Sequence, residues 1–202
     1  GKSAGRAGLE VEFIVVDNQS SDGGAVLASR NGARVLSCPD MRVGALRNAG
    51  AAIAEGDRLA FLDADIEVPE NWLVAGLQAL EQGADVIALD CDTPRQAPWF
   101  ARVWQKRSMS QTGKDRHPEW MPTPNLLMAR STFNSSTGFD EHLSSGEDKA
   151  FGLMLHAEKK RQAMLASPVA LHWGYERSWS EWIRKEFWRQ SSHIHLFREQ
   201  AR

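Results

Sequence analysis

The chain has 202 residues, of which 42% are hydrophobic, and its 24 basic and 26 acidic side chains give a net charge of −2. This length is enough to bury the core of one globular domain. The near balance of charge argues against a nucleic-acid-binding surface, which needs clustered basic residues. Cys38 and Cys91 are the only cysteines. Neither a disulfide framework nor a cysteine-rich zinc site is therefore expected, and a reducing, cytoplasmic location is the natural interpretation.

Short apolar runs alternate with helical patterns in the first two-thirds of the chain, which predicts βαβ units around a mostly parallel sheet. Residues 1–8 are small and polar and are expected to form a flexible segment. The expected strands are 11–16, 34–37, 59–62 and 85–89. The expected helices are 24–29, 43–55 and one that begins near Pro69 and ends at Gly83.

The composition changes after Asp90, where prolines and tryptophans become frequent. The polar residues 106–122 are expected to form a mobile loop. The remaining expected elements are strands at 125–130 and 164–166, a helix at 148–158 and an aromatic-rich amphipathic helix or helix pair over 178–197.

Two carboxylates, Asp63 and Asp65, directly follow the buried strand 59–62. If the backbone stays extended there, residues two apart point to the same side and both carboxylates face one site. Such a pair repels unless a cation lies between its members, and these oxygen ligands suit Mg²⁺ or Mn²⁺. An ordinary solvated turn is the alternative, and the triplet alone would favour it.

Asp17 follows another predicted strand, 11–16. Ligands of open α/β sheets bind at the carboxyl ends of the strands, where this carboxylate can accept hydrogen bonds from a base or ribose. Capping of the next helix explains Ser21 and Asp22 without a ligand. Capping does not explain Asp17.

Five segments resemble, in the expected order, signatures of family 2 glycosyltransferases of the GT-A fold. They are residues 11–23, which end in DNQSSDG, then 45–50 (ALRNAG), 61–65 (FLDAD), 138–141 (GFDE) and 146–148 (GED). The resemblance implies a Rossmann-like α/β fold of the GT-A type, with a mostly parallel sheet flanked by helices. It also implies one catalytic domain over 9–202, in which 9–92 bind a nucleotide sugar and 93–202 bind the acceptor.

The resemblance implies roles for the matched residues. Asp17 would contact the nucleobase, Arg47 would lie near the nucleotide or its diphosphate, and Asp63 would touch the ribose or donor sugar. Asp65 would ligate the metal, Mn²⁺ or Mg²⁺. For Arg47 a surface salt bridge on its helix is the alternative.

Asp148 would be the catalytic base, because the reaction needs a carboxylate within hydrogen-bond reach of the acceptor hydroxyl. Glu147 is the competing base, and we assign it instead to substrate binding or to a helix cap. His172 resembles a histidine that completes the metal site in some GT-A enzymes, although a structural role is equally open. His193 and His195 have no expected metal role, since alternate positions on a helix do not converge.

Residues 178–197 carry tryptophans among basic side chains. One interpretation is peripheral contact with a membrane surface or a lipid-linked acceptor. The other, which we favour, is that the face of Trp179, Trp182, Ile183 and Phe187 packs on the core.

Members of the family usually begin with a strand and a helix ahead of the Asp17 strand, and no strand pattern precedes Val11 here. Omission or truncation of that segment is the favoured explanation. The alternative is that a partner supplies the strand, and the exposed sheet edge would then invite a homodimer.

The expected activity is inverting, metal-dependent transfer of a sugar from a UDP- or GDP-sugar to a saccharide or lipid-linked acceptor. Cell-envelope polysaccharide synthesis at the inner face of the membrane would be its setting. One rival is a sugar nucleotidyltransferase, which needs a glycine-rich first loop with a basic residue. Another is a catalytically silent carbohydrate-binding relative, against which retention of Asp65 and Asp148 argues.

Overall fold

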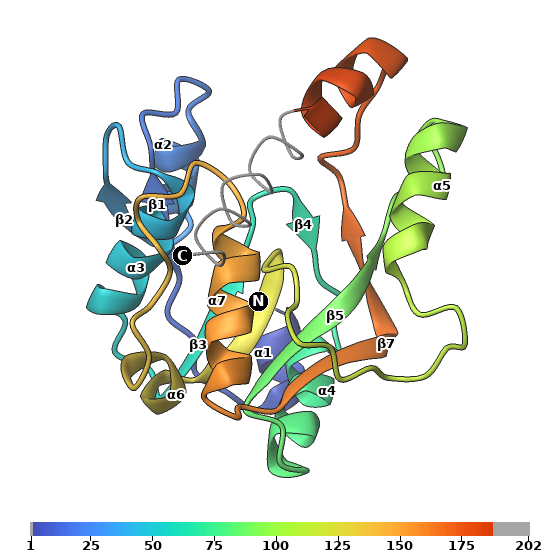
Figure 1. Ribbon diagram of the computed structural model, residues 1–202. Helices are drawn as coiled ribbons and strands as arrows, with labels where there is room; N and C mark the ends of the chain where they lie inside the picture. The colour runs from blue at the N-terminus through green and yellow to red at the C-terminus, as the bar shows by residue number, and fades with distance from the viewer. Residues whose placement is uncertain (1, 188–202) are drawn as a thin grey trace, which may run out of the picture.

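The structure is a computed structural model that describes residues 2–187 (Figure 1). The helices are α1 (Lys2–Ala7), α2 (Gly24–Arg30), α3 (Val43–Ile53), α4 (Trp72–Glu81), α5 (Trp99–Ser108), α6 (Arg130–Asn134) and α7 (Glu147–Ala157). The strands are β1 (Ile14–Asp17), β2 (Arg34–Ser37), β3 (Arg58–Leu62), β4 (Ile66–Glu67), β5 (Val86–Asp92), β6 (Asn125–Ala129) and β7 (Gln162–His172). Residues 179–187 form a further helix, here called the C-terminal helix.

Five strands form the central sheet in the order β3-β6-β5-β7-β4, and β1 pairs with β2 in a separate two-stranded sheet. The α/β class with flanking helices is confirmed, but the prediction of a mostly parallel sheet is wrong. Only β1–β2 and β5–β7 are parallel pairs, whereas β6 and β4 run antiparallel to their neighbours. β3 and β5 do point the same way, as a βαβ unit requires. β6 arrives later in the chain and inserts between them.

Both faces of the central sheet are covered by helices, because side chains along a strand alternate between its faces. On β5, Val86 and Ala88 belong to the core under α3, α6 and α7, while Ile87 and Leu89 belong to the core under α1 and α4. All four are at most 1% exposed. This two-sided burial explains why β5 reads as a continuous apolar run in the sequence.

The N-terminal residues, expected to be flexible, form α1 against α4 (Figure 1). Leu73 N donates to Ser3 Oγ at 3.0 Å, and Arg6 pairs with Glu70 at 2.5 Å. Ala4 is buried in the core beneath α4. Their polar composition hid this helix, because the contacts that hold it come from residues about seventy positions away.

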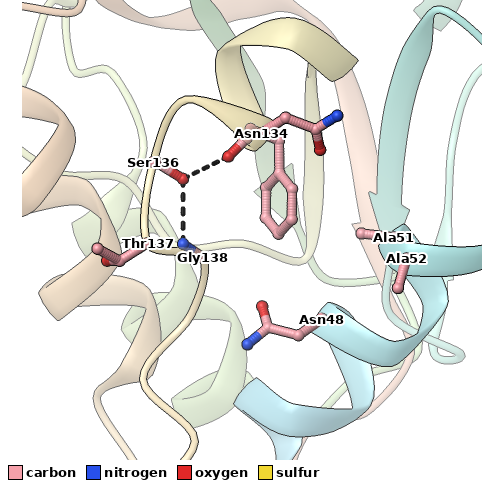
Figure 2. Close-up of a pocket in the computed structure, with 8 residues that line it drawn as sticks. Asn48, Ala51, Ala52, Asn134, Ser136, Thr137 and Gly138 are labelled. Carbon is pink, nitrogen blue, oxygen red and sulfur yellow. Dashed lines mark hydrogen bonds between the residues drawn. The ribbon is translucent and has the colours of Figure 1, made fainter.

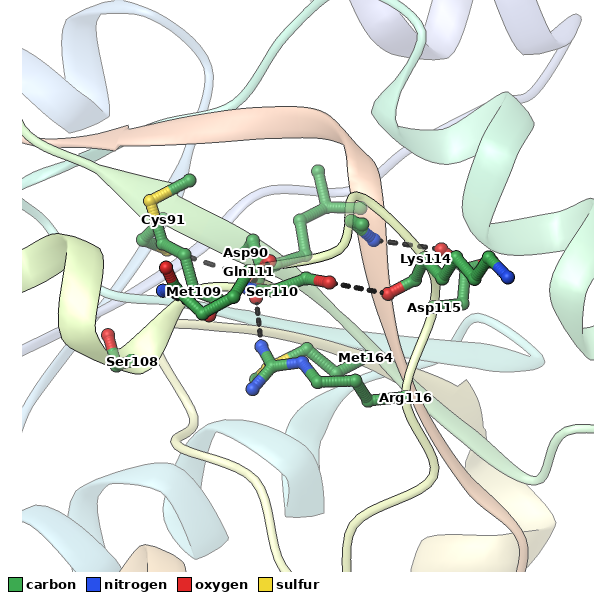
Figure 3. A network of polar contacts seen from close by, with 12 residues as sticks. Asp90, Cys91, Ser108, Met109, Ser110, Gln111, Lys114, Asp115, Arg116 and Met164 are labelled. Atoms are coloured by element: carbon green, nitrogen blue, oxygen red, sulfur yellow. Dashed lines mark hydrogen bonds and ion pairs between the residues drawn. The ribbon is translucent and has the colours of Figure 1, made fainter.

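The segment 106–122 is a loop after the end of α5, as its polarity predicted, and it makes polar contacts with the sheet (Figure 3). Its first part completes α5, and the rest is anchored by Asp90, which is 3% exposed. Asp90 accepts a hydrogen bond from Ser110 N at 2.7 Å and forms an ion pair with Arg116. The backbone of Arg116 also pairs with Met164 of β7. Ser110 and Arg116 therefore tie this segment to the sheet.

Most of the other predicted elements are confirmed, with ends that differ by a few residues. β7 is much longer than the expected 164–166. Residues 188–197 of the expected last helix, with His193 and His195, lie outside the described residues. Within 2–187, no helix combines the length and apolar character needed to cross a membrane.

Candidate active site

Arg47 joins three segments of the chain that are distant in sequence. From α3, Nη1 donates to Glu147 Oε1 at 2.6 Å and Nη2 donates to Asp63 Oδ1 at 2.9 Å. Its side chain is 12% exposed and that of Glu147 is 13% exposed. Burial lowers the pKa of Arg47, but the two carboxylates outweigh burial and raise it overall. Arg47 is thus part of a largely buried ion-pair network, not of a surface salt bridge.

Asp63 and Asp65 do not face one site side by side, so the expectation of an extended backbone is wrong. Ile66 N donates to Asp63 O at 3.1 Å, and this hydrogen bond closes a turn between the two aspartates. Asp63 points to Arg47, whereas Asp65 Oδ2 lies 3.3 Å from His172 Nε2. The turn therefore gives each carboxylate a different partner.

The pair Asp65–His172 is held where β4 meets β7, because Ile66 and His172 are register partners. A hydrogen bond from His172 lowers the pKa of Asp65, against the opposing effect of burial. Gly174 leaves the space for this contact. A Cβ at that position would overlap Asp65 Oδ2 and lie 2.9 Å from His172 Nε2.

The donor set of Asp65 and His172 fits a divalent cation. An octahedral ion with ligands at about 2.1 Å places neighbouring ligand atoms about 3 Å apart, close to the observed 3.3 Å. Mn²⁺ accepts such a mixture of carboxylate and imidazole, and Mg²⁺ favours the oxygen ligand. Residues 2–187 contain no group of three or more His, Cys, Asp or Glu side chains arranged for a metal. A bound substrate or water could supply further ligands beyond these described side chains.

Asp148 lies in the first turn of α7, directly after Glu147, which accepts a hydrogen bond from Arg47. Burial, and next the negative charge of Glu147, raise the pKa of Asp148 to about 6. Lys149 N donates to Asp148 Oδ1 at 2.7 Å and partly offsets this effect. A carboxylate with a pKa near 6 is ionised at neutral pH and accepts protons more readily than an ordinary aspartate.

Asn48 of α3 holds the segment that leads to α7, and in the sequence it stood out only as part of the motif 45–50. Its Nδ2 donates to Phe139 O at 2.8 Å, and its Oδ1 accepts from Phe139 N at 2.9 Å. Nδ2 also donates to Glu141 Oε1 at 2.9 Å. Arg47 and Asn48 are consecutive residues of α3. Arg47 holds the start of α7, and Asn48 holds the segment that leads to α7. Nothing in the sequence links Asn48 to position 139.

Asp17 ends β1 and belongs to the smaller sheet. Its Oδ1 accepts a hydrogen bond from Ser20 N at 3.2 Å. Contrary to the sequence analysis, Asp17 is thus partly explained by local turn formation. Among residues 2–187, Asp17 forms no hydrogen bond or ion pair with Arg47 or Asp63, so the structure does not bring it into their network.

A separate open pocket of about 290 Å³ lies between α3 and α6 (Figure 2). It contains none of the predicted site residues. Its lining consists of Asn48, Ala51, Ala52, Phe133, Asn134, Ser136, Thr137 and Gly138. Because it lacks acidic, basic and metal-binding side chains, the charged network around Arg47 is the better candidate site.

Comparison with known sequences gives a family. The sequence model described as glycosyl transferase family 2 matches residues 2–152. Uncharacterized glycosyltransferases of Mycobacterium bovis and of two Mycobacterium tuberculosis strains are 34% identical over 97 residues, which is 45% of this chain. The matched region covers 42% of each of those relatives, so the chain spans less than half of their length.

Comparison with solved structures gives the fold. GalNAc-T7, crystallised with UDP, GalNAc and Mn²⁺, matches 80% of this chain and 37% of its own with a TM-score of 0.63 at 16% identity. Residues 1–349 of Staphylococcus aureus TarS match 80% of this chain and 50% of theirs, with a TM-score of 0.59 at 20% identity. The fold is therefore of the GT-A type.

Proposed function

The chain belongs to glycosyl transferase family 2, and we propose that it transfers a sugar from a nucleoside-diphosphate sugar to an acceptor hydroxyl with inversion at the anomeric carbon. The observation that carries this proposal is the placement of Asp148. It is a half-buried carboxylate with a pKa of about 6, next to Glu147, which Arg47 ties to Asp63.

Asp148 is the proposed base. As the acceptor oxygen attacks the anomeric carbon, Asp148 takes the hydroxyl proton, and the bond from that carbon to the diphosphate oxygen breaks. The electron pair of the broken bond leaves with the nucleoside diphosphate. Attack opposite to the leaving group inverts the anomeric configuration in a single step.

Asp63 and Glu147 are the proposed donor-binding carboxylates, and Arg47 is proposed to sit close to the diphosphate. The side chain of Asp63 is 42% exposed, so its free oxygen has room for a ribose or sugar hydroxyl. Arg47 is too buried to move far, and we assign it mainly to positioning these two carboxylates. Asp17, at the end of β1, is the proposed contact for the nucleobase.

Asp65 and His172 are the proposed protein ligands of Mn²⁺ or Mg²⁺. When bound, the cation stabilises negative charge that develops on the diphosphate. The presence of UDP and Mn²⁺ in the GalNAc-T7 structure supports this assignment by analogy of fold. The protein contributes an oxygen and a nitrogen donor that the β4–β7 pairing holds 3.3 Å apart.

Isothermal titration tests the proposal directly. UDP- and GDP-sugars are titrated with Mn²⁺ and again with EDTA, and Asp65→Asn is compared with Asp22→Asn, an exposed aspartate outside the site. We expect one nucleotide sugar to bind only with Mn²⁺, and Asp65→Asn alone to weaken this binding. Failure of every nucleotide sugar to bind would contradict the proposal.

Two rival functions give different products. A sugar nucleotidyltransferase would release pyrophosphate from a nucleoside triphosphate and a sugar phosphate. A silent carbohydrate-binding relative would bind a glycan without nucleotide or metal. Release of a nucleoside diphosphate together with a glycosylated acceptor supports transfer and excludes both.

The acceptor and setting follow from the same proposal. We propose a saccharide or lipid-linked acceptor on the cytoplasmic side of the membrane, in cell-envelope polysaccharide synthesis.

Among the described strands, β1 pairs only with β2 and β3 only with β6. Each therefore has one edge without a strand partner, and these edges are where a homodimer would form.

A further inference from the structure

Helix α5 and the C-terminal helix each expose apolar side chains, and Trp99 meets Trp179 between them with ring centroids 5.6 Å apart. We call this the α5 surface, and it is made of Trp99, Val103, Ile183 and Phe187. These residues are 66%, 64%, 47% and 75% exposed, respectively. Large apolar side chains grouped at one place on a surface mark an interaction site more often than scattered ones do.

Aromatic contacts hold the two helices side by side at the upper right of Figure 1. Phe100 of α5 stacks on Trp179 with ring centroids 4.6 Å apart, and Trp104 meets Trp182 edge-on at 5.1 Å. The expected packing of this face on the core is wrong for Trp179, Ile183 and Phe187, which are 49%, 47% and 75% exposed. Only Trp182 is half-buried.

Charge on α5 and the residues around it is of one sign, whereas the C-terminal helix carries both signs, with Glu181 and Glu186 near Arg184 and Lys185. No acidic residue occurs between Thr93 and Lys114, although the whole chain carries a net charge of −2. The basic residues of this stretch are Arg95, Arg102, Lys106, Arg107 and Lys114.

Basic and apolar residues share one face of α5. Trp99, Arg102, Val103 and Lys106 follow the i, i+3, i+4, i+7 spacing of such a face, and all four are exposed. Within residues 2–187, neither Arg102 nor Lys106 forms a salt bridge. Their charges are therefore available to an external anion.

We propose that the α5 surface docks on a lipid bilayer that carries anionic headgroups, with α5 lying in the plane of the interface. Tryptophan and valine enter the boundary between headgroups and acyl chains, and the long basic side chains extend to the lipid phosphates. A second copy of the chain is a poor occupant, because a symmetric contact through α5 brings like charges together.

The surface is also joined to the candidate site. Lys185 of the C-terminal helix lies 3.7 Å from Glu176 and 3.5 Å from Gly174 O. Gly174 is two residues beyond His172, so docking would hold the proposed metal site at a fixed place relative to the membrane.

Vesicle co-sedimentation tests this inference without a sugar donor. The chain is mixed with vesicles of phosphatidylcholine alone, or of phosphatidylcholine and phosphatidylglycerol in equal parts. We expect partition into the mixed vesicles only. Since each basic side chain near an anionic surface contributes about fivefold to the partition coefficient, Arg102→Gln should lower partition about fivefold.

Val103→Glu tests the apolar contact and should abolish partition. Its matched control is Leu27→Glu on α2, because Leu27 is also 64% exposed and lies away from α5. Thermal unfolding verifies that Val103→Glu and Leu27→Glu are folded. If Val103→Glu does not fold, the milder change Arg102→Gln carries the test. Equal partition into both vesicle types, no partition at all, or equal effects of Val103→Glu and Leu27→Glu would overturn the inference. A concentration-dependent dimer that Val103→Glu disrupts would overturn it in favour of a second copy.

Discussion

Arg47 Nη1 lies 2.6 Å from Glu147 Oε1 and fastens α3 to the start of α7 across 100 residues of sequence. The contact also fixes Asp148, the next residue along the helix. Asp148 is thereby held through its neighbour, in addition to the hydrogen bond that its own carboxylate accepts from Lys149 N.

Replacing Arg47 by methionine should destabilise the fold by about 3 kcal/mol, because it leaves the mostly buried Glu147 without its cation. Lys2→Met is the control, since Lys2 pairs with Glu70 at the surface with a side chain 85% exposed. The control should change stability by less than about 1 kcal/mol. Urea denaturation measures both, and equal losses would show that Arg47 behaves like a surface ion.

Asp148→Asn should stabilise the protein at neutral pH. Ionising Asp148 with a pKa of about 6 instead of 3.8 costs the fold about 3 kcal/mol. The folded state binds this proton more tightly, so the stability contributed is present below the ordinary pKa and is lost as pH rises through about 6. The free energy of unfolding of Asp148→Asn should not fall in this way as pH rises from about 3.8 to above 6, as measured by urea denaturation across that range. Glu158→Gln, exposed after α7, is the control and should keep it.

The pH dependence of catalysis should follow the same carboxylate. We expect kcat/KM to be flat above a pH of about 6 and to fall below it, because the base must be ionised. Since the charge of Glu147 helps to raise this pKa, Glu147→Gln should move the acidic limb to lower pH. If kcat/KM falls at the same pH in Glu147→Gln as in the unmodified chain, the ionisation behind the acidic limb does not belong to Asp148.

Asn48→Ala should lower both stability and kcat, because it removes the hydrogen bonds that hold Phe139 and Glu141 against α3. The cost should be about 2 kcal/mol for the lost bonds. Asn134→Ala, an exposed change beside the pocket of Figure 2, is the control and should leave kcat unchanged. Unchanged kcat in Asn48→Ala would mean that the 138–141 segment does not position the base.

Gly174→Ala should abolish Mn²⁺ binding while the chain stays folded. The added Cβ would occupy the space next to Asp65 Oδ2 and His172 Nε2. Electron paramagnetic resonance of free Mn²⁺ measures the binding. Gly5→Ala is the control, because a Cβ at Gly5 has nothing within 4 Å. Full Mn²⁺ binding by Gly174→Ala would place the metal elsewhere.

The sequence predicted most strands and helices because apolar periodicity and glycine signals are local features. It did not predict that Asp63 and Asp65 separate, because the turn that divides them depends on a single backbone hydrogen bond. It missed α5 for a different reason. That helix is polar overall, and its stability comes from the burial of Phe100 and from aromatic contacts with the C-terminal helix.

Parts of the candidate site were likewise beyond sequence reasoning. The ordered motifs pointed to Arg47, Glu147 and Asp148, and the structure shows Arg47 in contact with Glu147, while the roles of all three stay predictions. The clamp between Asn48 and Phe139 was not predictable, because its partners are 91 residues apart and one of them contributes only backbone atoms.

The role of Asp148 as the base is the central claim, and a turnover assay with Asp148→Asn tests it most directly. The donor found by titration is mixed with acceptor and Mn²⁺, and release of nucleoside diphosphate is followed at a pH above 6, where Asp148 is ionised. We predict that Asp148→Asn binds the donor as the unmodified chain does but transfers no measurable sugar. Full turnover by Asp148→Asn would contradict the account.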